Sequence, residues 1–222
     1  MPPEYSVISL GTLSAHPLWN ESSPVRTPHA TTTLIVAEDH RILVNPSLPL
    51  PVLQARMSER TPVRPEEITH VFMTSLAGDH RRGLEGFPSA RWLAFDTELS
   101  HEAERLRSEM EDATAHDDQE TAELISAMSA ALDRVEPAGD QLAPGVDLFP
   151  LPGLTPGTCG LLISQPRATV LVSGDAVATR EHLERGQVLP RCADLEQAQE
   201  SFREAIEIAD VIIPGRDNLL HR

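Results

Sequence analysis

The chain has 222 residues, with 34 acidic side chains, 18 basic side chains and a formal net charge of -16. This charge argues against a nucleic acid or an acidic membrane surface as a partner, because binding to phosphates depends on clustered Arg and Lys. No apolar stretch approaches the ~20 residues of a membrane span. The two cysteines, Cys159 and Cys192, lie too far apart in sequence to suggest a zinc cage or a disulfide framework. We therefore expect a cytoplasmic protein with a single domain over residues 1–222.

The first half of the chain contains short aliphatic runs bounded by Pro, Gly and Asn, a pattern typical of buried strands. The expected strands cover residues 5–10, 31–37, 41–44, 68–74 and 91–95. A turn at residues 38–40 joins the second and third strands as a hairpin. A short helix is expected at residues 52–60, ending before Pro62.

The second half begins with a charged, Ala-rich segment at about 98–136, which lacks Gly and Pro and predicts two helices divided at residues 114–118. We interpret it as a solvated helical pair, with a lid over a site as the alternative. Strands are expected at 146–150, 160–164 and 168–173. Asp194 caps an amphipathic helix that leads to a strand at 211–213. Strands with helices interposed in both halves predict a layered α/β protein.

Four loops follow predicted strands: TSLAGDH at 74–80, PGLTPG at 152–157, SGDA at 173–176 and IIPGRD at 212–217. In this order and spacing they resemble the T-H-x-H-x-D-H, P-G-H-T-P-G, G-D and P-G-H motifs of the metallo-beta-lactamase superfamily. The flanking runs ITHVFMT, GLEGFPSARWLAF and ILVNP agree with the same family. The resemblance covers nearly the whole chain and implies the four-layer αβ/βα sandwich of that family.

The resemblance also implies a metal centre, because family members hold two ions that share a carboxylate and bind an attacking hydroxide. The first ion takes three His ligands, and this sequence has Ser75, Ala77 and Leu154 at those positions. A hydroxyl is a poor zinc ligand, and Ala and Leu cannot bind a metal at all. We expect the first metal site to be lost.

The second ion of the family takes four ligands, and here Asp79, His80 and Asp175 stand at three of those positions while Arg216 replaces the fourth. Arg stays protonated and has no lone pair for a metal. Our hypothesis is that its guanidinium replaces the metal as the counter-charge for the two carboxylates. No cofactor is then expected. The alternative is one Zn, Mn or Fe ion held by Asp79, His80 and Asp175.

Two other arrangements remain open. His16, Trp19 and His29 lie in an N-terminal segment that can reach the mouth of the site. Together with His80 and a carboxylate, this segment can build a displaced site for one metal ion. We favour structural or surface roles for these histidines. A serine hydrolase built on Ser75, His80 and an Asp lacks the G-x-S-x-G motif and has less support.

The function expected from this pattern is that of a degenerate relative which binds a small ligand or acts as a regulator. Its ligand would enter the old cleft, lined by Ser75, Ala77, Leu154 and Arg216. The alternative is a hydrolase of lactones, thioesters or phosphoesters that uses one residual metal. A third interpretation is an inactive subunit paired with an active paralogue. The sequence assigns no catalytic residue and leaves the ligand, the protein partner and a homodimer open.

Overall fold

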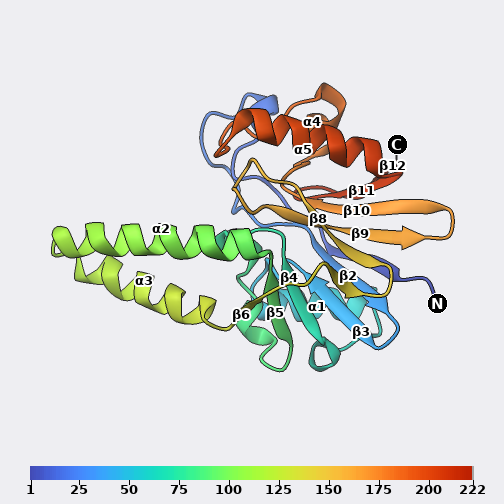
Figure 1. Cartoon of the computed structure of the whole chain (residues 1–222), viewed down its shortest axis with the longest axis horizontal. Coiled ribbons are helices and arrows are strands. Elements are labelled where there is room, and N and C mark those ends of the chain that lie inside the picture. Colours follow the sequence, from blue (N-terminus) through green and yellow to red (C-terminus); the bar gives the residue numbers. More distant parts are fainter. Residues whose placement is uncertain (222) are drawn as a thin grey trace.

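The computed structural model describes residues 1–221, which form two six-stranded sheets with helices outside them (Figure 1). The first sheet has the order β1-β2-β3-β4-β5-β6. Its strands are β1 (Glu4–Ser9), β2 (Thr32–Ala37), β3 (His40–Val44), β4 (His70–Met73), β5 (Arg91–Ala94) and β6 (Val135–Pro137). The pairs β1-β2 and β2-β3 are antiparallel, and the remaining pairs are parallel.

The second sheet has the order β12-β11-β10-β9-β8-β7. Its strands are β7 (Gln141–Ala143), β8 (Val146–Pro150), β9 (Cys159–Gln165), β10 (Ala168–Gly174), β11 (Val211–Pro214) and β12 (Leu220–His221). Only β10 and β11 pair in parallel, and α5 (Leu195–Ile208) connects them. This is the crossover that a parallel pair requires.

Apolar side chains fill three layers, because the strands alternate between the two faces of each sheet. The inner faces of the two sheets meet in one core, to which β3 contributes Ile42 and Val44. Leu43, between them, faces outward toward α1 (Leu50–Arg60) in a second core. On the outer face of the second sheet, Phe202 of α5 packs in a third core. This helix-sheet-sheet-helix order is the four-layer sandwich expected from the sequence.

Two long helices, α2 (Asp96–Ala115) and α3 (Gln119–Leu132), form an arm that extends away from the sheets (Figure 1). The division near residues 114–118 is as expected, but the helical pair ends earlier than 136. Val135 begins β6 and pairs with Trp92, because this apolar side chain completes the edge of the first sheet. The arm has a small core of its own, formed by Leu106, Ala113 and Ile125.

The sequence patterns missed the shortest elements. Strands β6 and β7 have three residues each and β12 has two, too few for an alternation to be visible. The short helix α4 (Arg180–Arg185) was also missed, although Thr179 caps its first turn and Gly186 ends it with a φ of 62°. None of the helices in residues 1–221 combines the length and the apolar character that a membrane span requires.

Candidate functional site

The loops that follow β4, β8, β10 and β11 carry the residues singled out in the sequence. The loop after β11 lies directly against the loop after β10, since Gly215 packs on the Asp175 carboxylate with no space for a side chain. The backbone N–H of Arg216 donates to Ala178 O at 2.8 Å, and Gly215 N–H donates to Val177 O. These contacts fix the position from which the Arg216 side chain enters the site.

Arg216 is the centre of a cluster with Asp79, Asp175 and His80, which we call the Arg216 cluster. Its Nε and Nη2 donate to the two oxygens of Asp175 at 2.8 and 2.6 Å. Its Nη1 donates to Asp79 Oδ2 at 2.6 Å. The bidentate pair with Asp175 is the geometry in which Arg binds a carboxylate most strongly. The structure thus brings together the four residues that the sequence motifs assign to a second metal site.

The charges of the cluster compensate one another in a buried place. Arg216 and Asp175 are 7% and 5% exposed, so neither charge is solvated by water. Burial by itself raises the pKa of Asp175, but the Arg216 charge lowers that pKa far below its usual value. Burial likewise lowers the pKa of Arg216, whereas Asp175 and Asp79 raise it above its ordinary value. Both groups therefore stay ionised in the folded protein.

His80 completes the cluster through Nε2, which lies 3.0 Å from Arg216 Nη2 and 3.2 Å from Asp175 Oδ2. A guanidinium can only donate, so the shorter contact requires a lone pair on Nε2 and the ring proton on Nδ1, toward Thr74 Oγ1 at 3.4 Å. With this tautomer, Arg216 uses four of its five N–H groups inside the cluster. The second N–H of Nη1 makes no hydrogen bond within the cluster.

A metal ion does not fit this set of side chains. The guanidinium already occupies the space between Asp79, Asp175 and His80 and provides the positive charge, and it offers no lone pair. An ion bound to these three residues would require Arg216 to leave. Among residues 1–221, no group of three or more His, Cys, Asp and Glu side chains is arranged to hold a metal.

Ser75, at one of the three positions that the sequence motifs assign to the first metal site, belongs to a different cluster, which we call the Glu98 network. Glu98 Oε1 accepts hydrogen bonds from Ser75 Oγ and Leu76 N, both at 2.9 Å. Its Oε2 accepts from Thr155 Oγ1 at 2.5 Å. Glu98 is only 2% exposed, and its donors come from the loops after β4 and β8. Ser75 is therefore bound to Glu98 and not to His80, which removes the support for a Ser75-His80 hydrolase.

Sequence reasoning missed Glu98 because it lies in the first turn of α2, outside every motif. The available signal was local, since an acid in the first turn of a helix is stabilised by the helix dipole. The backbone of Glu98 touches Gly157, which has no space for a side chain there. The glycine of PGLTPG thus lets the loop after β8 approach the helix closely enough for Thr155 to bond.

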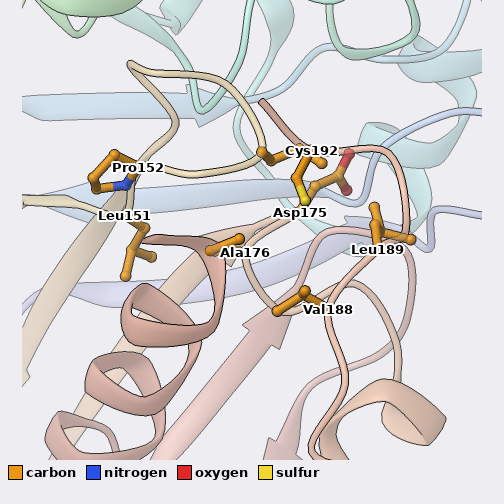
Figure 2. Close-up of a pocket in the computed structure, with 9 residues that line it drawn as sticks. Leu151, Pro152, Asp175, Ala176, Val188, Leu189 and Cys192 are labelled. Carbon is orange, nitrogen blue, oxygen red and sulfur yellow. The ribbon is translucent and has the colours of Figure 1, made fainter. Parts of the chain in front are cut away.

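Ala77 and Leu154, the other two replaced positions, do not share a cavity with Ser75. Ala77 is exposed, and Leu154 lines a small apolar pocket beside Asp175 together with Val188, Leu189 and Cys192. Figure 2 shows Cys192 and Leu189 close to the Asp175 carboxylate. The pocket has a volume of about 10 Å³, which is space for roughly one water molecule. Leu154 and Arg216 thus line two different cavities, and neither cavity is lined by Ser75 or Ala77.

A larger cleft of about 340 Å³, the mouth cleft, is lined in part by Arg216. Its charged and ring-bearing lining residues are His16, Trp19, Arg180, Glu181, Arg216 and Asp217. The rings of His16 and Trp19 stack with centroids 4.1 Å apart, and Trp19 Nε1 donates to Glu181 Oε1 at 3.2 Å. His16 and Trp19 of the N-terminal segment therefore line a cleft together with Arg216.

His29 does not take part in this cleft. Its Nδ1 lies 3.1 Å from Thr27 O and its Nε2 lies 3.0 Å from Leu10 O, so both ring nitrogens face backbone carbonyls of its own segment. Neither His16 nor His29 contacts His80, whose ring faces Thr74, Asp175 and Arg216. The structure does not bring the histidines of the N-terminal segment together with His80.

Several solved structures share the fold of this chain. A putative metallo-beta-lactamase of Thermotoga maritima is 17% identical, with a TM-score of 0.70 over 100% of both chains. The dizinc quorum-quenching lactonase AidC is 16% identical, with a TM-score of 0.63 over 80% of this chain and 67% of its own. A variant of B. thuringiensis AiiA with N-decanoyl-L-homoserine bound at its active site is 18% identical. Its TM-score is 0.63, over 97% of this chain and 93% of its own.

No curated protein matches the sequence. The profile of the metallo-beta-lactamase superfamily, in contrast, matches residues 26–216, which include the first three loops, the fourth loop as far as Arg216, and both clusters. With the two packed sheets and the outer helices, this match establishes that the chain belongs to the metallo-beta-lactamase superfamily.

Proposed function

We propose that this protein is a non-hydrolytic member of the superfamily that binds a small ligand or acts as a regulator. The observation that carries the proposal is Arg216, whose guanidinium donates to both carboxylates and to His80. A hydrolytic member needs a metal to lower the pKa of the attacking water. A fixed guanidinium supplies charge but cannot bind a hydroxide as a metal does.

The Glu98 network supports the same proposal. At Ser75, one of the three positions where the first ion would require a neutral imidazole, the side chain donates instead to a buried carboxylate that also accepts from Leu76 N and Thr155 Oγ1. Neither half of the family's dinuclear centre then retains the chemistry that activates water. The mouth cleft, which is the cavity next to Arg216, is where we place the ligand.

The second candidate is a hydrolase with one residual metal at Asp79, His80 and Asp175. Its support is that the structure brings these three ligands together and that several similar folds are lactonases. It requires Arg216 to swing out of the cluster.

A panel of lactones, aryl esters, thioesters and phosphoesters, assayed with and without added zinc or manganese, separates the two. We expect no turnover above that of the Asp79→Asn variant under any condition. Metal-stimulated turnover that Asp79→Asn abolishes would show the single-metal hydrolase instead.

A further inference from the structure

Helix α3 of the arm packs onto α2 through Ile125, which is 3% exposed, and its opposite side faces solvent (Figure 1). On that side Leu124 is 61% exposed, and Ala127 is exposed as well. A single exposed Leu is ordinary on a soluble protein, so Leu124 alone indicates nothing. The residues around it are what distinguish this surface.

The exposed side of α3 lacks charge over most of its length. Residues 124–132, LISAMSAAL, contain no acidic or basic side chain, whereas 23% of the whole chain is charged. The neighbouring α2 carries charged side chains from one end to the other. An uncharged outer side is typical of a helix that another element covers. Within residues 1–221 nothing covers this side of α3, so a covering element would come from another molecule.

Five residues follow one another along this side at helical spacing, and we call them the α3 stripe: Glu120, Leu124, Ala127, Ala131 and Arg134. Steps of three and four residues place side chains on one face of a helix, and Arg134 continues the row just after α3 ends. The order along the stripe is an acid, a large apolar residue, two small residues and a base.

This order is complementary to its own reverse. When two copies of α3 lie antiparallel, Glu120 of each copy faces Arg134 of the other. Leu124 faces Ala131, and a large side chain opposite a small one allows two helices to approach closely. Ala127 then meets its own counterpart on the two-fold axis, as the symmetry of a homodimer requires. A parallel pair would instead place like charges against one another at both ends.

The two charged ends of the stripe are free to make this contact. Glu120 and Arg134 are exposed, and neither has an ion-pair partner within residues 1–221. Arg134 lies over the Trp92 ring at 3.8 Å and donates to Pro88 O at 3.4 Å, so its remaining N–H groups can bind a carboxylate. Copies with a net charge of -16 repel one another over most of their surface. On the α3 stripe, in contrast, each charge meets an opposite one.

From this self-complementary order and the unpaired charges, we propose that the α3 stripe binds a second copy of this chain, with the two arms packed antiparallel as a four-helix bundle. A partner of another kind would not require the stripe to match its own reverse. The stripe residues neither line the mouth cleft nor belong to the two clusters, so the proposal goes beyond the proposed function and does not depend on it. The contact is small, and we expect a dissociation constant in the micromolar range.

Sedimentation velocity of the full chain at increasing concentration tests the proposal. We expect the wild type to shift from monomer to dimer by about 100 µM. Ala127→Glu places two carboxylates together on the two-fold axis and should weaken the dimer at least about tenfold. Because Ala127 is exposed and Glu is a good helix former, this variant should fold. Leu195→Glu, which adds the same charge at an exposed apolar position on α5, is the matched control and should leave the dimer unchanged.

Exchange of the two charges tests the antiparallel order. Glu120→Arg and Arg134→Glu should each weaken the dimer about fivefold, because each variant places like charges opposite one another at both ends of the contact. The double variant should regain most of the wild-type affinity. It also controls for folding, since a loss caused by misfolding of Arg134→Glu would persist in the double variant.

A wild type that stays monomeric up to about 100 µM would overturn the proposal and leave the stripe to a different protein. A dimer of unchanged strength in Ala127→Glu would overturn it as well, because the contact would then lie elsewhere on the molecule. Failure of a double variant with wild-type circular dichroism to regain affinity would overturn the antiparallel pairing.

Discussion

The Arg216 cluster and the Glu98 network contain residues that the sequence motifs assign to the two halves of the family's metal centre, and in our proposal they replace it in different ways. The first keeps two carboxylates of the ancestral ligand set and adds a cation with four N–H contacts. The second keeps none of the ligands and brings in one carboxylate with neutral donors. A site that retains its acids needs a positive charge, whereas a site that loses its imidazoles can be closed by hydrogen bonds alone.

This difference predicts that the Arg216 cluster contributes more to the free energy of unfolding than the Glu98 network does. Arg216→Met keeps much of the side-chain volume but leaves two carboxylates unpaired, one of them buried. We expect the free energy of unfolding, measured in urea at pH 7, to fall by about 3–5 kcal/mol. Arg91→Met is the matched control, since Arg91 pairs with Glu136 at the surface and should cost less than about 1 kcal/mol.

The loss of stability in Arg216→Met should depend on pH. Because the pKa of Asp175 is lowered in the folded protein, the wild type has this stabilisation above the carboxyl's unfolded pKa near 4 and loses it as the pH falls toward the folded value. In Arg216→Met, protonation of the carboxylates relieves their repulsion. The gap in stability between the two proteins should therefore shrink below about pH 4. A constant gap from pH 7 to pH 3 would count against the counter-charge role.

The Glu98 network is expected to contribute less. Glu98→Gln keeps one acceptor oxygen and converts the other to an amide that cannot accept from a hydroxyl, so one of Ser75 and Thr155 loses its partner. The expected loss is about 1–3 kcal/mol in the same unfolding experiment. Glu104→Gln, at an exposed position of the same helix, should have almost no effect. A loss as large as that of Arg216→Met would remove the contrast between the two sites.

The smallest effect is expected at His182, outside both clusters. Burial and the neighbouring His16 lower the pKa of His182 to about 4. A lowered pKa stabilises the protein fully above the unfolded value near 6.5, and this stability is lost as the pH falls toward 4. In His182→Gln, the free energy of unfolding should fall less steeply between pH 6.5 and pH 4. The difference in slope should correspond to the binding of at most one proton. His116→Gln, at an exposed position, serves as the control, and an equal slope in both variants would contradict this role.

The sequence alone predicted the sandwich and the Arg216 cluster, because both depend on motifs at strand ends. A loop such as TSLAGDH or IIPGRD must lie at the edge of its sheet, so Asp79, Asp175 and Arg216 were expected to meet. Glu98 could not be found in this way. It reaches the site from a helix that follows β5, and its role depends on the close approach of Gly157, which no local pattern encodes. The mouth cleft depends likewise on where the N-terminal segment packs.

The central claim is that the Arg216 guanidinium takes the place of the metal. The most direct test is the content of zinc, iron and manganese in wild-type protein purified without chelator, compared with Asp79→Asn and Asp175→Asn. We predict less than about 0.1 ion per chain in all three proteins, because the charge is already compensated by Arg216. About one ion per chain in the wild type, lost in either variant, would contradict the claim and place a metal where the structure has an arginine.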